Sequence, residues 1–246
     1  GDFYEMFFDD AIVVSKELEL TLTGKSCGAE ERAPMCGVPY HAVEGYLNKL
    51  VANGHKVAIC EQVEDPKLAK GLVKREVIRI VTPGTNTDMQ ALDESKNNYI
   101  MCIVYLADKY GISLADISTG DYFVTEVDTE RKLIDEINKF APSEIICNES
   151  FYMSGVDLSD IKNRLGIAVY SLEAWYFSDE TAENTLKEHF KVQSLEGLGL
   201  SDYACGTIAA GALLRYLYET QKNDLGNLSA IHPYSTGKYM IIDSST

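Results

Sequence analysis

Residues 99–127 read YIMCIVYLADKYGISLADISTGDYFVTEV, and this stretch decides the fold of the larger part of the chain. Its apolar and aromatic residues form short runs, which are separated by turn-forming segments containing Asp, Lys, Thr and Gly. Short runs of this kind, broken by such turns, are typical of neighbouring strands joined by tight connections. We therefore predict an antiparallel meander with strands at 99–106, 111–118 and 122–127.

The segments after the meander alternate between helical and strand-like patterns. Apolar residues recur at helical spacing up to Phe140, and Pro142 ends that helix because proline disfavours a helical residue before it. We further predict strands at 144–147 and 167–170, and helices near 158–165 and at 203–221. Hairpin-joined strands followed by alternating helices and strands form the element order of a ribonuclease H-like fold.

The first 90 residues mix strands and helices in a different order. The clearest helix spans 42–51, where the apolar residues share one face and Gly54 ends the helix. Residues 24–34 are predicted to form a hairpin loop. The other predicted elements are strands at 3–8, 20–23, 56–62 and 73–81, and a helix with Ala11, Val14 and Leu18 on one face. This part is predicted to be a mixed α/β domain.

A polar, turn-rich segment at 83–98, PGTNTDMQALDESKNN, separates these two patterns. A chain of 246 residues is long enough for two domains of ordinary size, and it contains no internal repeat. We place the domain boundary within this segment.

Composition limits the class of protein. Hydrophobic residues make up 46% of the chain, but no run approaches the ~18 apolar residues of a membrane span, and the start lacks a signal-peptide pattern. We therefore expect a soluble, cytoplasmic protein. The cysteines form no Cys-x-x-Cys pair, so we expect reduced, mostly buried thiols and no metal site.

The net charge of −16 argues against a nucleic-acid partner, because polyanions repel an acidic chain. The acids are unevenly distributed, however. Residues 1–90 hold 10 basic and 14 acidic residues, a net charge of −4, which leaves −12 for residues 91–246. The first part is therefore the one better suited to DNA.

Two enzymatic alternatives arise from the residues. A ribonuclease H-like fold can carry a metal-dependent nuclease, for which Asp116, Asp121 and Glu144 are the acids near strands, although their positions do not establish convergence. The sequence Gly24-Lys25-Ser26 matches the end of a nucleotide-binding P-loop, but Glu19 stands where that motif requires glycine. We therefore predict no catalytic residues and no nucleotide site, with the nuclease kept as the alternative function.

Phe3 and Glu5 form an unusual pair. Residues i and i+2 of a strand share a face, so Phe3 and Glu5 project together, while Tyr4 and Met6 point to the other side. An exposed aromatic ring beside a carboxylate is suited to wedging into a base step, where the acid can bind a displaced base. The alternative interpretation is an ordinary half-buried strand.

Three long motifs resemble the MutS family of bacterial DNA mismatch-recognition proteins. They are GDFYEMFFDDA at 1–11, PMCGVPYHAVEGYLNKLVANGHKVAICEQVEDP at 34–66 and VKREVIRIVTPGT at 73–85. The segment LADISTGDY at 114–122 and the helix at 205–221 resemble the connector domain of that family, and residues 239–246 resemble the entry to its central core. The resemblance covers essentially the whole chain, and it leads us to expect a fragment truncated at both ends.

The resemblance implies a mismatch-recognition domain at 1–90, a ribonuclease H-like connector at 97–225 and the start of the core at 226–246. It implies that Phe3 is the stacking wedge and Glu5 the base-contacting acid. Lys25 is the nearest candidate for a DNA-backbone contact. The other basic cluster, Lys74, Arg75 and Arg79, is interpreted as a solvated strand face.

The resemblance also implies the partners of the whole protein. They are mismatched double-stranded DNA and a MutL-like protein that binds partly through the connector. The family parent is expected to be a homodimer that uses ATP with Mg²⁺, whereas this fragment is expected to bind no cofactor or metal and to have no enzymatic activity. A module that only binds other proteins is a third alternative.

Overall fold

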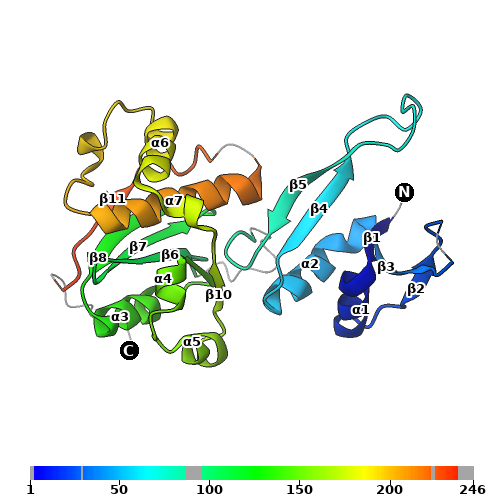
Figure 1. Cartoon of the computed structure of the whole chain (residues 1–246), viewed down its shortest axis with the longest axis horizontal. Coiled ribbons are helices and arrows are strands. Elements are labelled where there is room, and N and C mark those ends of the chain that lie inside the picture. The colour runs from blue at the N-terminus through cyan, green and yellow to red at the C-terminus, as the bar shows by residue number, and fades with distance from the viewer. Residues whose placement is uncertain (1–2, 29, 87–95, 223–224, 238–246) are drawn as a thin grey trace. The chain divides into compact units, whose positions relative to one another are not determined.

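The structure is a computed structural model, and it describes residues 3–28, 30–86, 96–222 and 225–237. The chain divides into two compact units, 1–92 and 93–246. Both units mix helices and strands (Figure 1).

The first unit is built around a small antiparallel sheet. The strands β1 (Phe3–Phe7), β2 (Thr23–Lys25) and β3 (Ala33–Pro39) lie in the order β1-β3-β2. The helix α1 (Phe8–Glu17) packs on this sheet, where Ala11 and Cys36 are fully buried. The core of this part of the unit therefore lies between one face of the sheet and the apolar side of α1.

Two details of this sheet differ from the sequence prediction. The strand expected at 20–23 lies at Thr23–Lys25, and the central strand β3 lies where we predicted no strand, with its first two residues in the loop predicted at 24–34. Pro34, Gly37 and Pro39 disfavour a central strand, which is why the sequence pattern did not predict β3. Both prolines lie close to the ends of β3, where a missing N–H disturbs the ladder least.

The rest of the first unit follows the prediction closely. A short 3₁₀ turn, Tyr40–Ala42, leads into α2 (Val43–Ala52), which buries Leu47, Leu50 and Val51. The strands β4 (Val57–Gln62) and β5 (Arg75–Val81) then pair as an antiparallel hairpin. The connection between them, drawn in cyan, projects beyond the ends of both strands (Figure 1).

The second unit contains a mixed sheet in the order β10-β9-β6-β7-β8-β11. The strands β6, β7 and β8 form the predicted antiparallel meander, and β9 and β10 add in parallel on the β6 side. The strands are β6 (Ile100–Leu106), β7 (Lys109–Asp116), β8 (Asp121–Val127), β9 (Glu144–Cys147), β10 (Ala168–Ser171) and β11 (His232–Pro233). This order confirms the ribonuclease H-like fold class.

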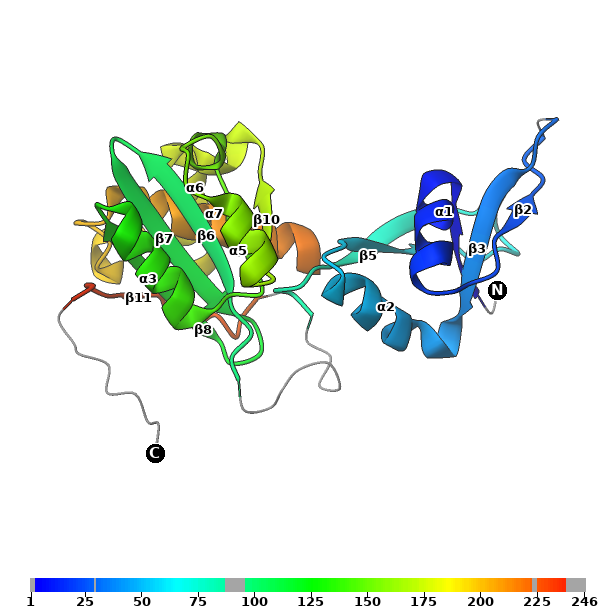
Figure 2. The same cartoon turned by 90° about the horizontal axis from the view of Figure 1, so that it is seen from below.

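Helices cover both faces of this sheet (Figure 2). One face packs against α3 (Glu130–Phe140), α4 (Glu149–Tyr152) and α5 (Leu158–Arg164). The other face packs against α7 (Ala204–Gln221), with α6 (Asp179–Phe190) alongside α7. Short 3₁₀ turns lie at Ala174–Phe177 and Glu196–Leu198. The sheet is thus the buried middle of three layers, and its central strands are almost wholly apolar.

Residues after α7 return to the same unit. Leu225, Leu228 and Ile231 are buried in the core, and β11 pairs in parallel with β8. The hydroxyl of Tyr234 donates a hydrogen bond to Glu136 at 2.6 Å. The segment 239–246, which resembles the entry to a further domain, lies outside the described residues.

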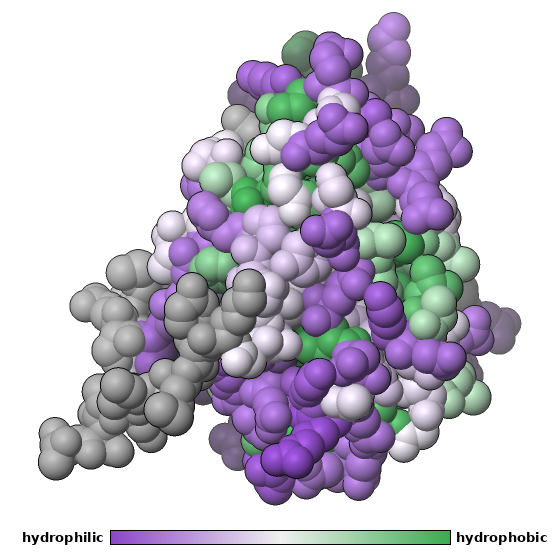
Figure 3. Space-filling model, turned by 90° about the vertical axis from the view of Figure 1, so that its left-hand side faces the viewer, coloured by the Kyte–Doolittle hydropathy of each residue, from purple (hydrophilic) through white to green (hydrophobic). Residues whose placement is uncertain are grey.

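The face of the second unit in Figure 3 is mostly hydrophilic, and its hydrophobic residues form separate patches. In the described part of the chain, no helix has the length and apolar character needed to cross a bilayer.

The cysteines give a prediction for thiol chemistry. All six are free; Cys27 and Cys60 are exposed, and the other four are buried. Burial raises the pKa of Cys205 to about 11 and that of Cys147 to about 12. Because the thiolate is the reactive form, we expect Ellman's reagent at pH 8 to modify two thiols rapidly and four only after denaturation. More than two fast-reacting thiols in the folded protein would contradict this burial pattern.

Candidate nucleic-acid interface

The strand β1 presents Phe3 and Glu5 on one face, as the alternation predicted. Both side chains are exposed, whereas the intervening Tyr4 and the following Met6 are partly buried. Phe3 keeps 59% of its surface exposed. Single exposed aromatic residues are common on protein surfaces, and Phe8 is as exposed as Phe3, so it is the combination of the Phe3 ring with a carboxylate on the same strand face that makes this face a candidate binding surface.

Lys25 lies on the same sheet and contacts Glu5 directly. Its Nζ is 2.5 Å from Glu5 Oε2, and it lies 5.4 Å from the centre of the Phe7 ring. Lys25 comes from β2 and Glu5 from β1, so the ion pair crosses over the central strand β3. The structure thus brings Glu5 and Lys25 together, with Phe3 adjacent to Glu5 on the same strand. The pair is a modest stabiliser, because both side chains remain substantially exposed to water.

Gly37 makes room for this arrangement. It pairs with Glu5 in the β1–β3 ladder, and a Cβ atom there would lie 3.7 Å from the Phe3 ring and 3.9 Å from Glu5 Cγ. The same atom would approach the carbonyl oxygen of Tyr4 to 3.3 Å, which is tighter than ordinary packing. Glycine therefore leaves the sheet surface free beneath Phe3 and Glu5. The sequence showed an isolated glycine, but its partner strand was needed to see this role.

The opposite side of β1 is anchored through Tyr4. Its ring stacks on Tyr40, with the ring centres 5.4 Å apart, and its hydroxyl donates a hydrogen bond to the Glu61 carboxylate. Burial, followed by the hydrogen bond and charge of Glu61, raises the pKa of Tyr4 well above its ordinary value. The hydroxyl therefore stays protonated and remains a donor. Sequence reasoning did not identify Tyr4, Tyr40 or Glu61 as contributors to the site.

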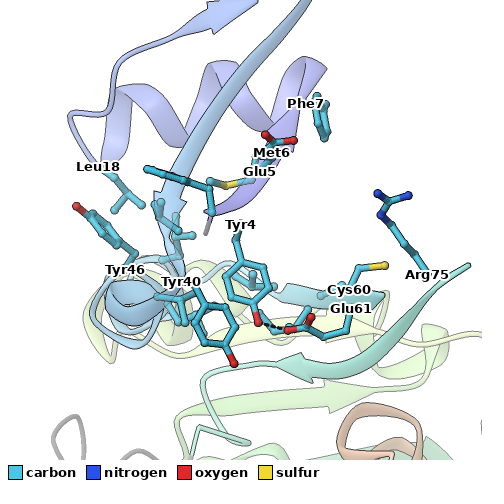
Figure 4. Close-up of a pocket in the computed structure, with 18 of the residues that line it drawn as sticks. Tyr4, Glu5, Met6, Phe7, Leu18, Tyr40, Tyr46, Cys60, Glu61 and Arg75 are labelled. Atoms are coloured by element: carbon cyan, nitrogen blue, oxygen red, sulfur yellow. Dashed lines mark hydrogen bonds between the residues drawn. The ribbon is translucent and has the colours of Figure 1, made fainter. Parts of the chain in front are cut away.

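A groove of about 660 Å³ is lined by residues of β1, α2 and the β4–β5 hairpin (Figure 4). Figure 4 shows Tyr4 directed toward Tyr40 and Glu61, while Glu5 and Phe7 lie on the other side of β1. The groove follows the edge of β1 that faces β4, and no strand pairs with this edge among the described residues. The face that carries Phe3 and Glu5 and the face that carries Tyr4 thus belong to the same edge strand.

The second basic cluster is largely engaged in surface ion pairs. Lys74 contacts Glu76 at 2.6 Å, and Arg79 lies 3.7 Å from Glu44. Such contacts are typical of a solvated strand face, which agrees with our interpretation of Lys74, Arg75 and Arg79.

The acids proposed for a nuclease lie at one end of the second sheet, but two of them serve local structure. Asp116 is buried, and its oxygens accept hydrogen bonds from the amide and hydroxyl of Ser118 and from the amide of Asn98. Asp121 accepts from Asn97 and Tyr99. Across the described ranges, no three His, Cys, Asp or Glu side chains are grouped so that they could hold a metal ion. The nuclease alternative is therefore not favoured.

The P-loop-like residues do not form a nucleotide site. Gly24 and Lys25 belong to the edge strand β2, which pairs with β3 and does not lead into the N-terminus of a helix. Phosphate binding by this motif requires a loop that opens a helix, so ATP does not fit here.

Comparisons with known proteins match one family model to each of the two units. The family model for MutS domain I matches residues 1–90, and that for MutS domain II matches residues 98–229. The DNA mismatch repair protein MutS of Lachnoclostridium phytofermentans is 65% identical over 246 residues, which is all of this chain and 26% of that protein. The corresponding proteins of Ruminiclostridium cellulolyticum and Acetivibrio thermocellus are each 49% identical over 249 residues. The chain thus spans about a quarter of the length of these relatives, 26% to 28%.

Proposed function

Because this chain belongs to the MutS family, we propose that it recognises mispaired or unpaired bases in double-stranded DNA, with Phe3 as the wedge and Glu5 as the base contact. The observation that carries the proposal is the exposed Phe3 ring beside Glu5 on one face of β1. Neither side chain is required for the core of the unit, so a binding role accounts for their exposure.

The wedge gains its selectivity from the deformability of DNA. Inserting an aromatic ring between base pairs unstacks one step and kinks the duplex, which costs a few kcal/mol. A mispaired step stacks and pairs less well, so it resists this deformation less than a matched step does. A wedge that bends every site in the same way therefore binds most tightly where the duplex is already weak.

In this proposal, Glu5 makes binding depend on a displaced base, and Lys25 reduces the repulsion between Glu5 and the DNA phosphates. A carboxylate near DNA is repelled by phosphates at every site, but it gains a hydrogen bond only where a base is displaced. Lys25 lowers this repulsion by pairing with Glu5, and its ammonium group can also meet the backbone. The pair thereby penalises matched DNA more than mismatched DNA.

The larger assembly is also a proposal from the family. We propose domains at 1–90 and 97–225, with 226–246 leading into a central core, in a cytoplasmic protein. The second unit would act as a connector that carries no catalysis and meets a MutL-like protein. The homodimer and the use of ATP with Mg²⁺ would belong to parts of the whole protein outside this chain.

Fluorescence anisotropy at low salt tests the proposal. The probes are a labelled duplex with one G·T mismatch, its fully matched counterpart and a duplex with one unpaired nucleotide. We expect tighter binding to the mismatched and unpaired duplexes than to the matched one. Equal affinity for all three would contradict the proposal. Mg²⁺-dependent cleavage that Asp116→Asn abolishes would support the nuclease instead.

Glu5→Gln tests the electrostatic role. The amide removes the charge, which lowers phosphate repulsion on both duplexes, but its hydrogen bond to a displaced base is weaker than that of a charged group, so affinity for G·T should stay near that of the unsubstituted chain. Affinity for the matched duplex should rise severalfold, because phosphate repulsion disappears without a compensating loss. Titration of both duplexes with both proteins measures the two effects. A large and equal loss of affinity on both duplexes would refute this role for Glu5.

A further inference from the structure

The strand that carries the proposed wedge is an edge strand, paired along its whole length with β3 alone among the described strands. Within the described residues, β1 pairs with β3 on one edge only, and its register places Phe3 opposite Pro39 at the end of the ladder. An edge strand with a single partner twists more easily than a strand paired on both sides. Driving an aromatic ring into a stacked duplex exerts a reaction force on this strand, so an additional anchor is needed.

Tyr4 provides contacts that fit such an anchor. It lies between Phe3 and Glu5, so its side chain projects to the opposite side of the strand. The Tyr40 ring that it stacks on follows the last residue of β3, and the carboxylate that it binds belongs to Glu61 of β4. The single side chain of Tyr4 therefore links the three-stranded sheet to the β4–β5 hairpin, which share no strand pairing in the described chain.

We propose that Tyr4, held by Tyr40 and Glu61, is a positioning residue that keeps the Phe3–Glu5 face in the orientation required for wedge insertion. This inference rests on the proposed function and adds residues on the side of β1 that faces away from the wedge. A strand that rocks about its axis moves the residues of its two faces together. Fixing Tyr4 therefore fixes the direction in which Phe3 and Glu5 project.

The chemistry of the contact suits a rigid anchor. A hydroxyl that donates to a carboxylate makes a charge-assisted bond, which is stronger than a bond between neutral groups. A tyrosine hydroxyl is already protonated near neutral pH, and burial together with the Glu61 contact raises the pKa of Tyr4 further, so the bond persists through the range of pH in which DNA is bound. Stacking on Tyr40 limits rotation of the ring, and the hydrogen bond fixes its end.

The test uses variants that separate the hydrogen bond from charge and packing. Tyr4→Phe keeps the ring and removes the donor, and Glu61→Met keeps the length of the side chain and removes the acceptor. Glu61→Gln keeps an acceptor oxygen and serves as the conservative rescue. Tyr105→Phe is the matched control, because Tyr105 also donates to a carboxylate, that of Asp108, but within the second unit.

The primary measurement is the ratio of dissociation constants for matched and G·T duplexes, obtained by anisotropy with each variant. We expect Tyr4→Phe and Glu61→Met to lower this ratio by about tenfold or more, the effect of losing one hydrogen bond to a charged group. Glu61→Gln should retain most of the ratio, and Tyr105→Phe should leave it unchanged. Combining Tyr4→Phe with Glu61→Met should add little, because both changes remove the same bond.

A second readout distinguishes positioning from stability. At saturating protein, 2-aminopurine beside the mismatch reports unstacking of the step, and the thermal midpoint of each variant reports its fold. A positioning role predicts reduced unstacking at temperatures where the variants are fully folded. If Tyr4→Phe retains the ratio of the two dissociation constants while Phe3→Ala loses it, the positioning role of Tyr4 is refuted and the wedge role of Phe3 is supported. If Phe3→Ala also retains the ratio, or if the unsubstituted chain has no preference, both proposals fall.

Discussion

Replacing Phe3 with alanine is expected to abolish most of the preference of this chain for mismatched over matched DNA. The substitution removes the exposed ring that is proposed to stack between base pairs, and it leaves Glu5 and Lys25 in place. Stacking of one base on an aromatic side chain contributes about 1 to 3 kcal/mol, a change of roughly 5- to 150-fold in affinity. Affinity for the G·T duplex should fall by this factor toward that of the matched duplex.

The matched control for this prediction is Phe8→Ala. Phe8 has the same side chain and nearly the same exposure, 61% against 59% for Phe3, but it lies in α1 and outside the wedge strand. Titration of G·T and matched duplexes should show discrimination lost with Phe3→Ala and kept with Phe8→Ala. Equal losses in the two variants would mean that exposed apolar surface, and not a wedge at one position, drives binding. The core of the unit excludes Phe3, so the substitution should leave the thermal midpoint nearly unchanged.

The second unit could be predicted from the sequence because each of its central strands is buried on both faces. Apolar runs such as that of β6, from Ile100 to Val104, leave few alternatives once turn residues mark their ends. The helix α6 was not predicted, because few of its residues are both apolar and buried. Its buried side is formed by Ala182, Thr185 and Leu186, which is a stripe too narrow and too polar to stand out among its charged residues.

In the candidate site too, some residues could be predicted from the sequence and others could not. The pairing of Phe3 with Glu5 follows from the two-residue period of a strand, and it was visible without a partner. Tyr4 and Glu61 are 57 positions apart, and only the placement of the β4–β5 hairpin brings them into contact. The role of Gly37 likewise depends on the antiparallel register with β1. Local periodicity thus predicts which face is exposed, whereas the residues that support that face come from tertiary structure.

Close packing of α6 against α7 predicts a large loss of stability for Gly211→Ala. A Cβ atom at Gly211 would lie 2.5 Å from the Cβ of Ala182 and even closer to its Cα, so one helix must move. Alanine is favoured over glycine inside a helix by about 0.5 to 1 kcal/mol, but overpacking of a rigid backbone costs about 3 kcal/mol. The clash therefore outweighs the gain in propensity, and the net loss of about 2 to 2.5 kcal/mol should lower the thermal midpoint of the second unit by roughly 4 to 10 °C.

Gly197→Ala separates this steric effect from the general effect of replacing glycine. Gly197 lies in the same unit, and a Cβ atom there would meet no other atom within 4 Å. Thermal unfolding followed by circular dichroism should show a clear shift for Gly211→Ala and little change for Gly197→Ala. Equal midpoints would show that α6 can move away from α7 without loss. In that case the α6–α7 contact would not be part of the cooperative core, and the layer that covers this face of the sheet would be α7 alone.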